Sequence, residues 1–156
     1  MSPDILNNIA LGTSIILATF LWHALTLDRL MRTIHHLLPR AGHSHQFRHF
    51  WRIAILFMMS VGIICIHSVE IWMWAVLYLE MDIAAVHNLE TSLYFSIVSM
   101  STVGYGDVVL DPAWRVLGAM QAASGMILFG WSTAFMFEVL AATYTRLNLR
   151  GTSHRD

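Results

Sequence analysis

The chain is poor in charge, proline and cysteine. Only 12 % of its 156 residues are charged, against about a quarter in soluble domains. The nine basic residues are all arginines and form no long basic run, so we expect no binding to nucleic acid. A single cysteine, Cys65, excludes an intramolecular disulfide. The sequence shows no nucleophile–base pair, phosphate-binding loop or closed metal site, so it does not predict an enzyme.

Apolar sequence is abundant, since 56 % of the residues are hydrophobic. The stretches 5–27, 53–79 and 116–144 each reach the roughly 20 mostly apolar residues that span a bilayer. The first stretch lacks the basic start and small-residue cleavage site of a signal peptide, so we expect it to remain as an anchor. A fourth apolar stretch, 93–100, is too short to span, and its place between two spans indicates a re-entrant element.

The arginines predict how these spans are oriented. Eight of the nine lie in segment 28–52 or after Tyr144, whereas segment 80–114 carries acidic residues and no arginine. Because basic residues concentrate on the cytoplasmic side, we expect segment 28–52 and the C-terminus in the cytoplasm. The N-terminus and segment 80–114 then lie outside. The small size and short loops favour a prokaryotic inner (plasma) membrane.

The motif STVGYGD occupies residues 101–107, directly after the short apolar segment. Gly104 and Gly106 permit positive φ, which lets successive carbonyl groups point the same way. Such a row of carbonyls, with the Thr102 hydroxyl below, can replace the water shell of a monovalent cation. The alternative is a glycine turn in an ordinary membrane bundle, but the flanking spans and the short helix, with Asn88 as N-cap, favour an ion site.

The stretch Thr102–Asp107 resembles the potassium-channel pore signature T-x-x-T-V-G-Y-G-D, and the resemblance covers roughly residues 53–144. It implies an all-α membrane protein with three transmembrane helices, a re-entrant pore helix and an extended selectivity filter. The permeant ion would be K⁺, with no other metal. Because four carbonyl rings require four loops and the chain has one, a homotetramer is implied. The filter residues of the motif are Thr102, Val103, Gly104, Tyr105, Gly106 and Asp107.

The sequence departs from the family pattern at three positions. Ser99 and Ser101 replace threonines, which keeps the hydroxyl groups. Val98 stands where many members have a carboxylate that pairs with the filter aspartate. Asp107 therefore needs another partner or faces water. We expect Val103 and Tyr105 to point away from the pore axis and to pack against the short helix.

The resemblance divides the chain into four parts. Residues 1–28 form an additional transmembrane helix, and residues 29–52 form a cytoplasmic loop rich in arginine and histidine. Residues 53–145 form the pore module, and residues 146–156 form a short tail. Nothing in these parts identifies the gating stimulus, and an unidentified regulatory subunit remains a candidate partner.

The third span is expected to line the pore. Asp111-Pro112 resembles the start of a helix, and Gly130, Ala134 and Glu138 follow at a spacing of four on one face. Glu138 would lie near the inner mouth, either in a ring of four carboxylates or paired with an arginine such as Arg146. Gly125 or Gly130 would provide a bend for gating.

Glu70 lies inside the second span, where an ionisable group needs a partner. If Ile5 and Leu79 mark the same membrane level, Glu70 lies level with Thr13 and Ser14. We therefore predict a hydrogen bond from this hydroxyl pair or from His67 to Glu70. The contact would tether the first span, and a proton-sensing role is the alternative reading.

Five histidines lie in segment 28–52. They are either solvated, or a pH sensor, or a metal site. A membrane protein that handles metal or senses pH through this segment is therefore the alternative function. The five residues are His35, His36, His43, His45 and His49.

Overall fold

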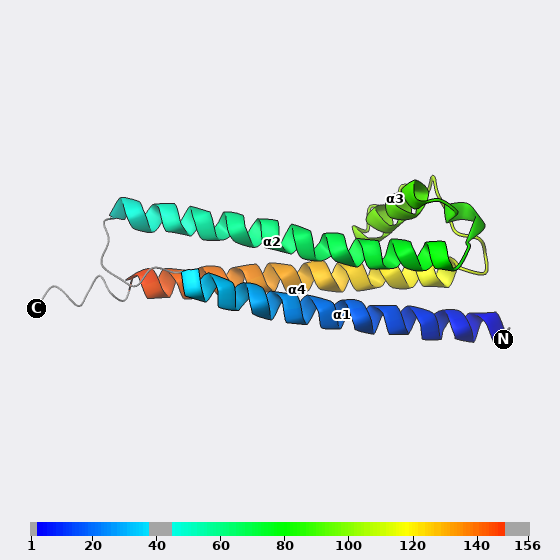
Figure 1. The fold of residues 1–156 in the computed structure, drawn as a ribbon, viewed down its shortest axis with the longest axis horizontal. Coiled ribbons are helices and arrows are strands. Elements are labelled where there is room, and N and C mark those ends of the chain that lie inside the picture. Colours follow the sequence, from blue (N-terminus) through cyan, green and yellow to red (C-terminus); the bar gives the residue numbers. More distant parts are fainter. Residues whose placement is uncertain (1–2, 38–44, 149–156) are drawn as a thin grey trace, which may run out of the picture.

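The computed structural model describes residues 3–37 and 45–148, and all its regular elements in these ranges are helices. Three long helices lie side by side, and the short α3 folds back beside one end of the bundle (Figure 1). α1 and α4 run in the same direction and α2 runs opposite to them. The elements are α1 (Pro3–Leu37), α2 (His45–Glu80), the 3-10 helix η1 (Ala84–Val86), α3 (Leu89–Met100) and α4 (Arg115–Asn148).

The three long helices are long and apolar enough to cross a membrane, over Ile5–Leu37, His49–Glu80 and Arg115–Thr143. The three predicted spans and the all-α membrane fold are thus confirmed. α3 and the chain that follows it lie at the same end of the bundle as the start of α1 (Figure 1). This common end agrees with the predicted grouping of the N-terminus with segment 80–114.

Three element boundaries differ from the prediction. The expected loop 29–52 is mostly helical, because α1 continues to Leu37 and α2 begins at His45. No glycine or proline interrupts residues 29–37, so the helix has no reason to stop earlier. α4 begins at Arg115 rather than at Pro112, since a turn with the Trp114 amide bonded to the Asp111 carbonyl (2.8 Å) precedes it.

The buried side chains form two apolar clusters at different levels of the bundle. One cluster, at the end where α3 packs, comprises Trp74, Tyr78, Ile83, Val86, Phe95, Leu110 and Leu117. The other cluster lies toward the far end and comprises Leu27, Ile34, Ile55, Met59, Ile63, Ile66, Phe135 and Val139. Buried polar side chains, including His23, Glu70 and Ser132, occupy the level between the two clusters.

Candidate functional site

The motif at 101–107 directly follows the C-terminal end of α3. Its N-terminus is capped as predicted, because the Asn88 side chain accepts a hydrogen bond from the Thr91 amide (2.8 Å). After Met100 the helix ends in tight turns. The amides of Ser101 and Thr102 still donate to carbonyls of the last turn, those of Ile97 and Ser99, at 3.0 Å each.

The backbone beyond α3 alternates into the left-handed region. Thr102, Gly104 and Gly106 have φ values of 60°, 54° and 77°. The two glycines therefore adopt the positive φ that the sequence predicts. Thr102 was not expected to adopt this conformation, which costs a non-glycine residue on the order of 1 kcal/mol. Its amide bond to Ser99 contributes to holding it there.

The amide groups of the motif point back to the helix that precedes it. The amides of Val103 and Gly104 both donate to the Val98 carbonyl, at 3.1 and 3.2 Å. Within the part of the chain that the structure describes, the carbonyl oxygens of residues 102–105 accept no hydrogen bond. These oxygens are therefore available to a ligand outside the chain.

Two apolar side chains of the motif are exposed in the single chain. Val103 is 52 % exposed and Tyr105 is 72 % exposed. The prediction that both pack against the short helix stays a prediction. α3 presents Phe95 and Ser96 to its own bundle, where both are buried.

Asp107 has a hydrogen-bond partner on α3, although the side chain of Val98 cannot form a hydrogen bond. The Tyr94 hydroxyl on α3 donates a hydrogen bond to Asp107 Oδ2. This bond lowers the pKa of the Asp107 carboxyl below its ordinary value and raises the pKa of Tyr94. Asp107 Oδ1 also accepts a hydrogen bond from the Val108 amide (3.0 Å), so the carboxylate holds the chain just after Gly106.

A buried set of neutral polar groups fixes α3 to α2 and α4. Tyr78 donates to Gln121 Oε1 (2.7 Å), and the Gln121 amide nitrogen donates to the Ser96 hydroxyl (2.7 Å) and carbonyl (3.3 Å). Ser96 in turn donates to the Ile71 carbonyl (2.8 Å). We refer to Tyr78, Ser96 and Gln121 as the amide network.

Gly125 lies where α4 touches the end of α3. A Cβ at this position would lie 2.1 Å from the Met100 carbonyl oxygen. Close packing beside the motif therefore requires glycine here, and a role for Gly125 as a gating bend remains a prediction. Gly130 differs, since a Cβ there would meet nothing within 4 Å.

The predicted pore-facing stripe of α4 lies on the outside of the single chain. Gly130, Ala134 and Glu138 are all exposed, whereas Phe135 and Val139 on the other side are buried in the bundle. The stripe is therefore free to face another chain or a water-filled space. The alternative partner of Glu138, the Arg146 side chain, lies outside the described residues.

Glu70 is fully buried and has two histidine partners. Its carboxylate oxygens lie 2.8 Å from His67 Nδ1 and 2.8 Å from His23 Nδ1, which joins α2 to α1. The predicted contact with His67 is thus confirmed. The predicted contact with Thr13 and Ser14 is wrong, because both are exposed and Ser14 bonds the Ala10 carbonyl of its own helix.

The error follows from the assumed alignment of the helices. The partner of Glu70 on α1 is residue 23 rather than 13, a difference of ten residues or about 15 Å along a helix. α1 begins beyond the end of α2 (Figure 1). Equal distances from the span ends therefore do not correspond to equal depth.

The histidine-rich segment forms no compact site among the described residues. His35, His36 and His49 are exposed, and no three side chains that include them gather as metal ligands in the described ranges. His43 and the side chain of His45 lie outside the described residues. The predicted sensor or metal role of this segment stays a prediction.

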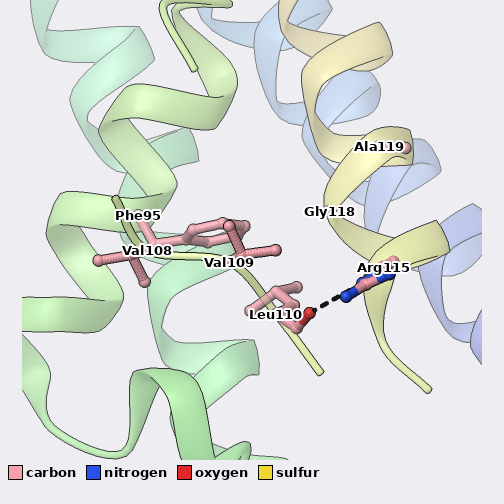
Figure 2. A pocket seen from close by; sticks show the side chains of 7 residues that line it. All are labelled: Phe95, Val108, Val109, Leu110, Arg115, Gly118 and Ala119. Carbon is pink, nitrogen blue, oxygen red and sulfur yellow. Dashed lines mark hydrogen bonds between the residues drawn. The ribbon is translucent and has the colours of Figure 1, made fainter. Parts of the chain in front are cut away.

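A small apolar pocket opens between the chain after the motif and the first turn of α4 (Figure 2). The Arg115 guanidinium closes one edge by donating to the Leu110 carbonyl (3.4 Å). Val109 at its mouth is 54 % exposed. The lining residues are Phe95, Val108, Val109, Leu110, Arg115, Gly118 and Ala119.

Comparison with known proteins gives a family match. The family described as "Ion channel" matches residues 64–142, about half of the chain, and the matched part contains the motif, α3 and most of α4. No curated protein and no solved structure was found to match. The match, together with three apolar spans, identifies a multi-pass membrane protein.

Proposed function

The chain belongs to the ion channel family, and we propose that it is a potassium-selective channel. In this proposal four copies surround one pore, and K⁺ passes down its gradient through rings formed by the carbonyls of Thr102, Val103, Gly104 and Tyr105. Gly106 and Asp107 hold the outer end of the filter. K⁺ is the permeant ion and no further cofactor is required.

The main support for the proposal is the row of carbonyl groups at residues 102–105. The amides of Val103 and Gly104 are occupied by the Val98 carbonyl, and the carbonyl oxygens of residues 102–105 accept no hydrogen bond from the residues that the structure describes. Positive φ at every second residue from Thr102 to Gly106 allows these carbonyls to point to one side. A ring of such oxygens is a known way to replace the hydration shell of K⁺.

The exposed surface around the filter supports the homotetramer. Val103, Tyr105 and Val109 are large apolar side chains that a single chain leaves more than half exposed. The pocket beside Val109 adds a hollow that a neighbouring chain can fill (Figure 2). Four identical head-to-tail contacts close into a ring around one axis, which brings the four filters together.

The proposed orientation places the filter end and the N-terminus outside and the C-terminus in the cytoplasm of a prokaryotic inner membrane. It is supported by the arginines in segment 28–52 and after Tyr144. A regulatory subunit would act from either side.

The test is ion flux from liposomes that contain the purified channel. We expect K⁺ efflux that Ba²⁺ blocks, little Na⁺ efflux, and a tetramer by native mass spectrometry in lipid. Gly104→Ala, which places a side chain at a φ of 54°, should abolish efflux. Val61→Ala, an exposed position on α2, is the matched control. Equal Na⁺ and K⁺ flux, or a monomer in lipid, would refute the proposal.

At the inner mouth we propose a ring of four Glu138 carboxylates that concentrates cations. Its support is the exposed stripe that Glu138 shares with Gly130 and Ala134. Glu138→Gln should lower single-channel conductance and weaken block by internal Mg²⁺. Unchanged conductance and unchanged block would eliminate the ring.

A further inference from the structure

Four buried side chains from three helices close a ring of hydrogen-bond contacts in the middle of the bundle. His23 comes from α1, His67 and Glu70 from α2, and Ser132 from α4. Glu70 contacts Nδ1 of both imidazoles at 2.8 Å. The Ser132 hydroxyl contacts Nε2 of His67 at 3.0 Å and Nε2 of His23 at 3.2 Å. We refer to these four residues as the polar ring.

The polar ring is sealed from water. His23 and Glu70 are 0 % exposed, and His67 and Ser132 are 5 % and 4 % exposed. The Trp131 ring lies 5.4 Å from the His23 ring, and the Phe129 ring lies 4.3 Å from the His67 ring. The Glu70 charge interacts with His23 and His67 and with no other charged side chain recorded among the described residues.

Counting hydrogens shows what the polar ring requires. Its four contacts each need one hydrogen between the two heavy atoms. A carboxylate supplies none, two neutral imidazoles supply one each, and the serine hydroxyl supplies one. The sum is three hydrogens for four contacts, with one uncompensated negative charge inside the membrane. Both deficits are costly in a buried site.

One additional proton removes both deficits. The proton either converts one histidine to imidazolium or converts Glu70 to the neutral acid. In each arrangement four hydrogens fill four contacts and the net charge of the polar ring is zero. A second proton would place two hydrogens in one contact and leave a buried positive charge. All four contacts of the polar ring are therefore filled when it binds one proton.

A divalent metal ion fits the same groups less well. The donor atoms of His23, His67 and Glu70 lie within 4.8 Å of one another. Each of these polar atoms already contacts another member of the polar ring, however. A divalent ion beside one carboxylate would also leave a net charge of +1 in the membrane, whereas a proton leaves none.

We propose that the polar ring is a proton-binding site that closes around a single proton, and that loss of this proton releases the contact between α1 and α4. Glu70 keeps both Nδ1–H donors when the proton leaves, because hydrogen bonds to a charged carboxylate are the stronger ones. One of the two contacts of Ser132 then lacks its hydrogen. The hydroxyl can donate to one imidazole, and its contact with His23 is the longer one.

The release links pH to the helix that carries Gly130, Ala134 and Glu138. Ser132 is the only member of the polar ring on α4, so its contact with His23 is the polar ring's direct link between α4 and α1. Histidine is the side chain whose unperturbed pKa lies between pH 5 and 8, so this is the range in which the switch is to be sought. The consequence for conduction rests on the proposed potassium channel, whereas the bound proton does not.

The decisive variant is Glu70→Gln. A glutamine side chain contributes one N–H to the polar ring where the carboxylate contributes none. Four contacts are then filled by four hydrogens with both histidines neutral, and no exchangeable proton is needed. The variant should keep the contacts and lose their pH dependence. Ser68→Ala is the matched control on α2, because the Ser68 hydroxyl bonds the Ile64 carbonyl of its own helix (2.8 Å).

Solid-state NMR of nitrogen-15-histidine-labelled protein in liposomes tests the proton directly. The signals of His23 and His67 are identified by their proximity to Trp131 and Phe129. Between about pH 5.5 and 8.5 we expect the wild type to lose the one Nε2–H that the closed polar ring carries in either arrangement, so that both histidines become Nδ1–H tautomers, and we expect no such change in Glu70→Gln. A wild-type polar ring that keeps the same hydrogens over this range would overturn the proposal, as would a variant that titrates like the wild type.

Potassium flux tests whether the bound proton affects conduction. Over the same pH range the flux of the wild type and of Ser68→Ala should change about fivefold or more, while the flux of Glu70→Gln stays nearly constant. An unchanged pH dependence in Glu70→Gln would contradict the coupling. If the protein conducts no K⁺, the NMR result still decides whether the proton is bound, so the two failures are distinguishable.

Discussion

The amide network and the polar ring hold helices together at two levels of the same bundle with different chemistry. The amide network joins α2, α3 and α4 through four contacts, and its phenol, amide and hydroxyl groups supply the four hydrogens themselves. The polar ring joins α1, α2 and α4 through four contacts for which its own groups supply only three hydrogens.

The difference separates permanent packing from conditional packing. The amide network needs nothing from solution and has no member that titrates near neutral pH, so it suits α3, which carries the motif at 101–107. The polar ring needs one proton from solution, so its strength varies with pH. The amide network therefore fixes α3 and the motif at every pH, whereas the polar ring attaches α1 in a way that depends on pH.

The largest effect is expected where the filter level is packed most tightly. Gly125→Ala would place a Cβ 2.1 Å from the Met100 carbonyl oxygen and push the end of α3 away. We expect a loss of about 3 kcal/mol in stability and no K⁺ flux at any pH. Gly130→Ala adds the same methyl group in open space, so tetramer melting in detergent should distinguish the two variants. Equal melting would show that this contact is not tight.

Ser132→Ala should have the next largest effect, because it removes both contacts of α4 to the polar ring. We expect a loss of about 2 kcal/mol in unfolding free energy, greatest at the acidic side of neutrality where the polar ring is closed. Thr133→Val is the control, since the Thr133 hydroxyl bonds the Phe129 carbonyl of its own helix (2.9 Å). A loss that is the same for both variants would contradict the distinction.

Tyr78→Phe removes one donor from the amide network and leaves Gln121 Oε1 without a hydrogen. A loss of about 1 kcal/mol is expected, and it should be the same at about pH 5.5 and 8.5. Denaturant unfolding in detergent at both pH values measures it. A penalty that varies with pH would remove the contrast with the polar ring.

The smallest effect is expected at the exposed pair of Tyr94 and Asp107. Because the folded pKa of Asp107 is lowered, its contribution is present above the ordinary aspartate pKa and is lost as pH falls through the lowered value. Tyr94→Phe should therefore raise the pH at which external acid stops K⁺ flux, and leave flux at alkaline pH close to that of the wild type. An unchanged acid midpoint would mean that the hydrogen bond does not support the filter.

The parts of the fold that depend on local sequence could be predicted. Long apolar runs specify the three spans, and Asn88 marks the start of α3. Gly104 and Gly106 revealed the left-handed backbone because few other residues adopt it. The left-handed Thr102 was missed, since no local signal distinguishes it from an ordinary helix-ending threonine.

The parts that depend on how helices align could not be predicted. Glu70 could be recognised as needing a partner, but His23 was found only when the offset of α1 along α2 was known. The one available signal was a histidine within an apolar span, which is uncommon and costly. Gln121 in the third span gave the same kind of signal, and Tyr94 could not be matched to Asp107 without the turn between them.

The attachment of α1 along its length has a mechanical consequence. Its N-terminal end is fastened by the Asn8 side chain, which donates to the Ala113 carbonyl just before α4. Its C-terminal third meets the bundle through Leu27 and Ile34, whose contacts lipid tails can replace at little cost. When the polar ring opens, α1 is therefore free to swing outward about a pivot near Asn8. The Asn8 contact prevents α1 from sliding along the bundle.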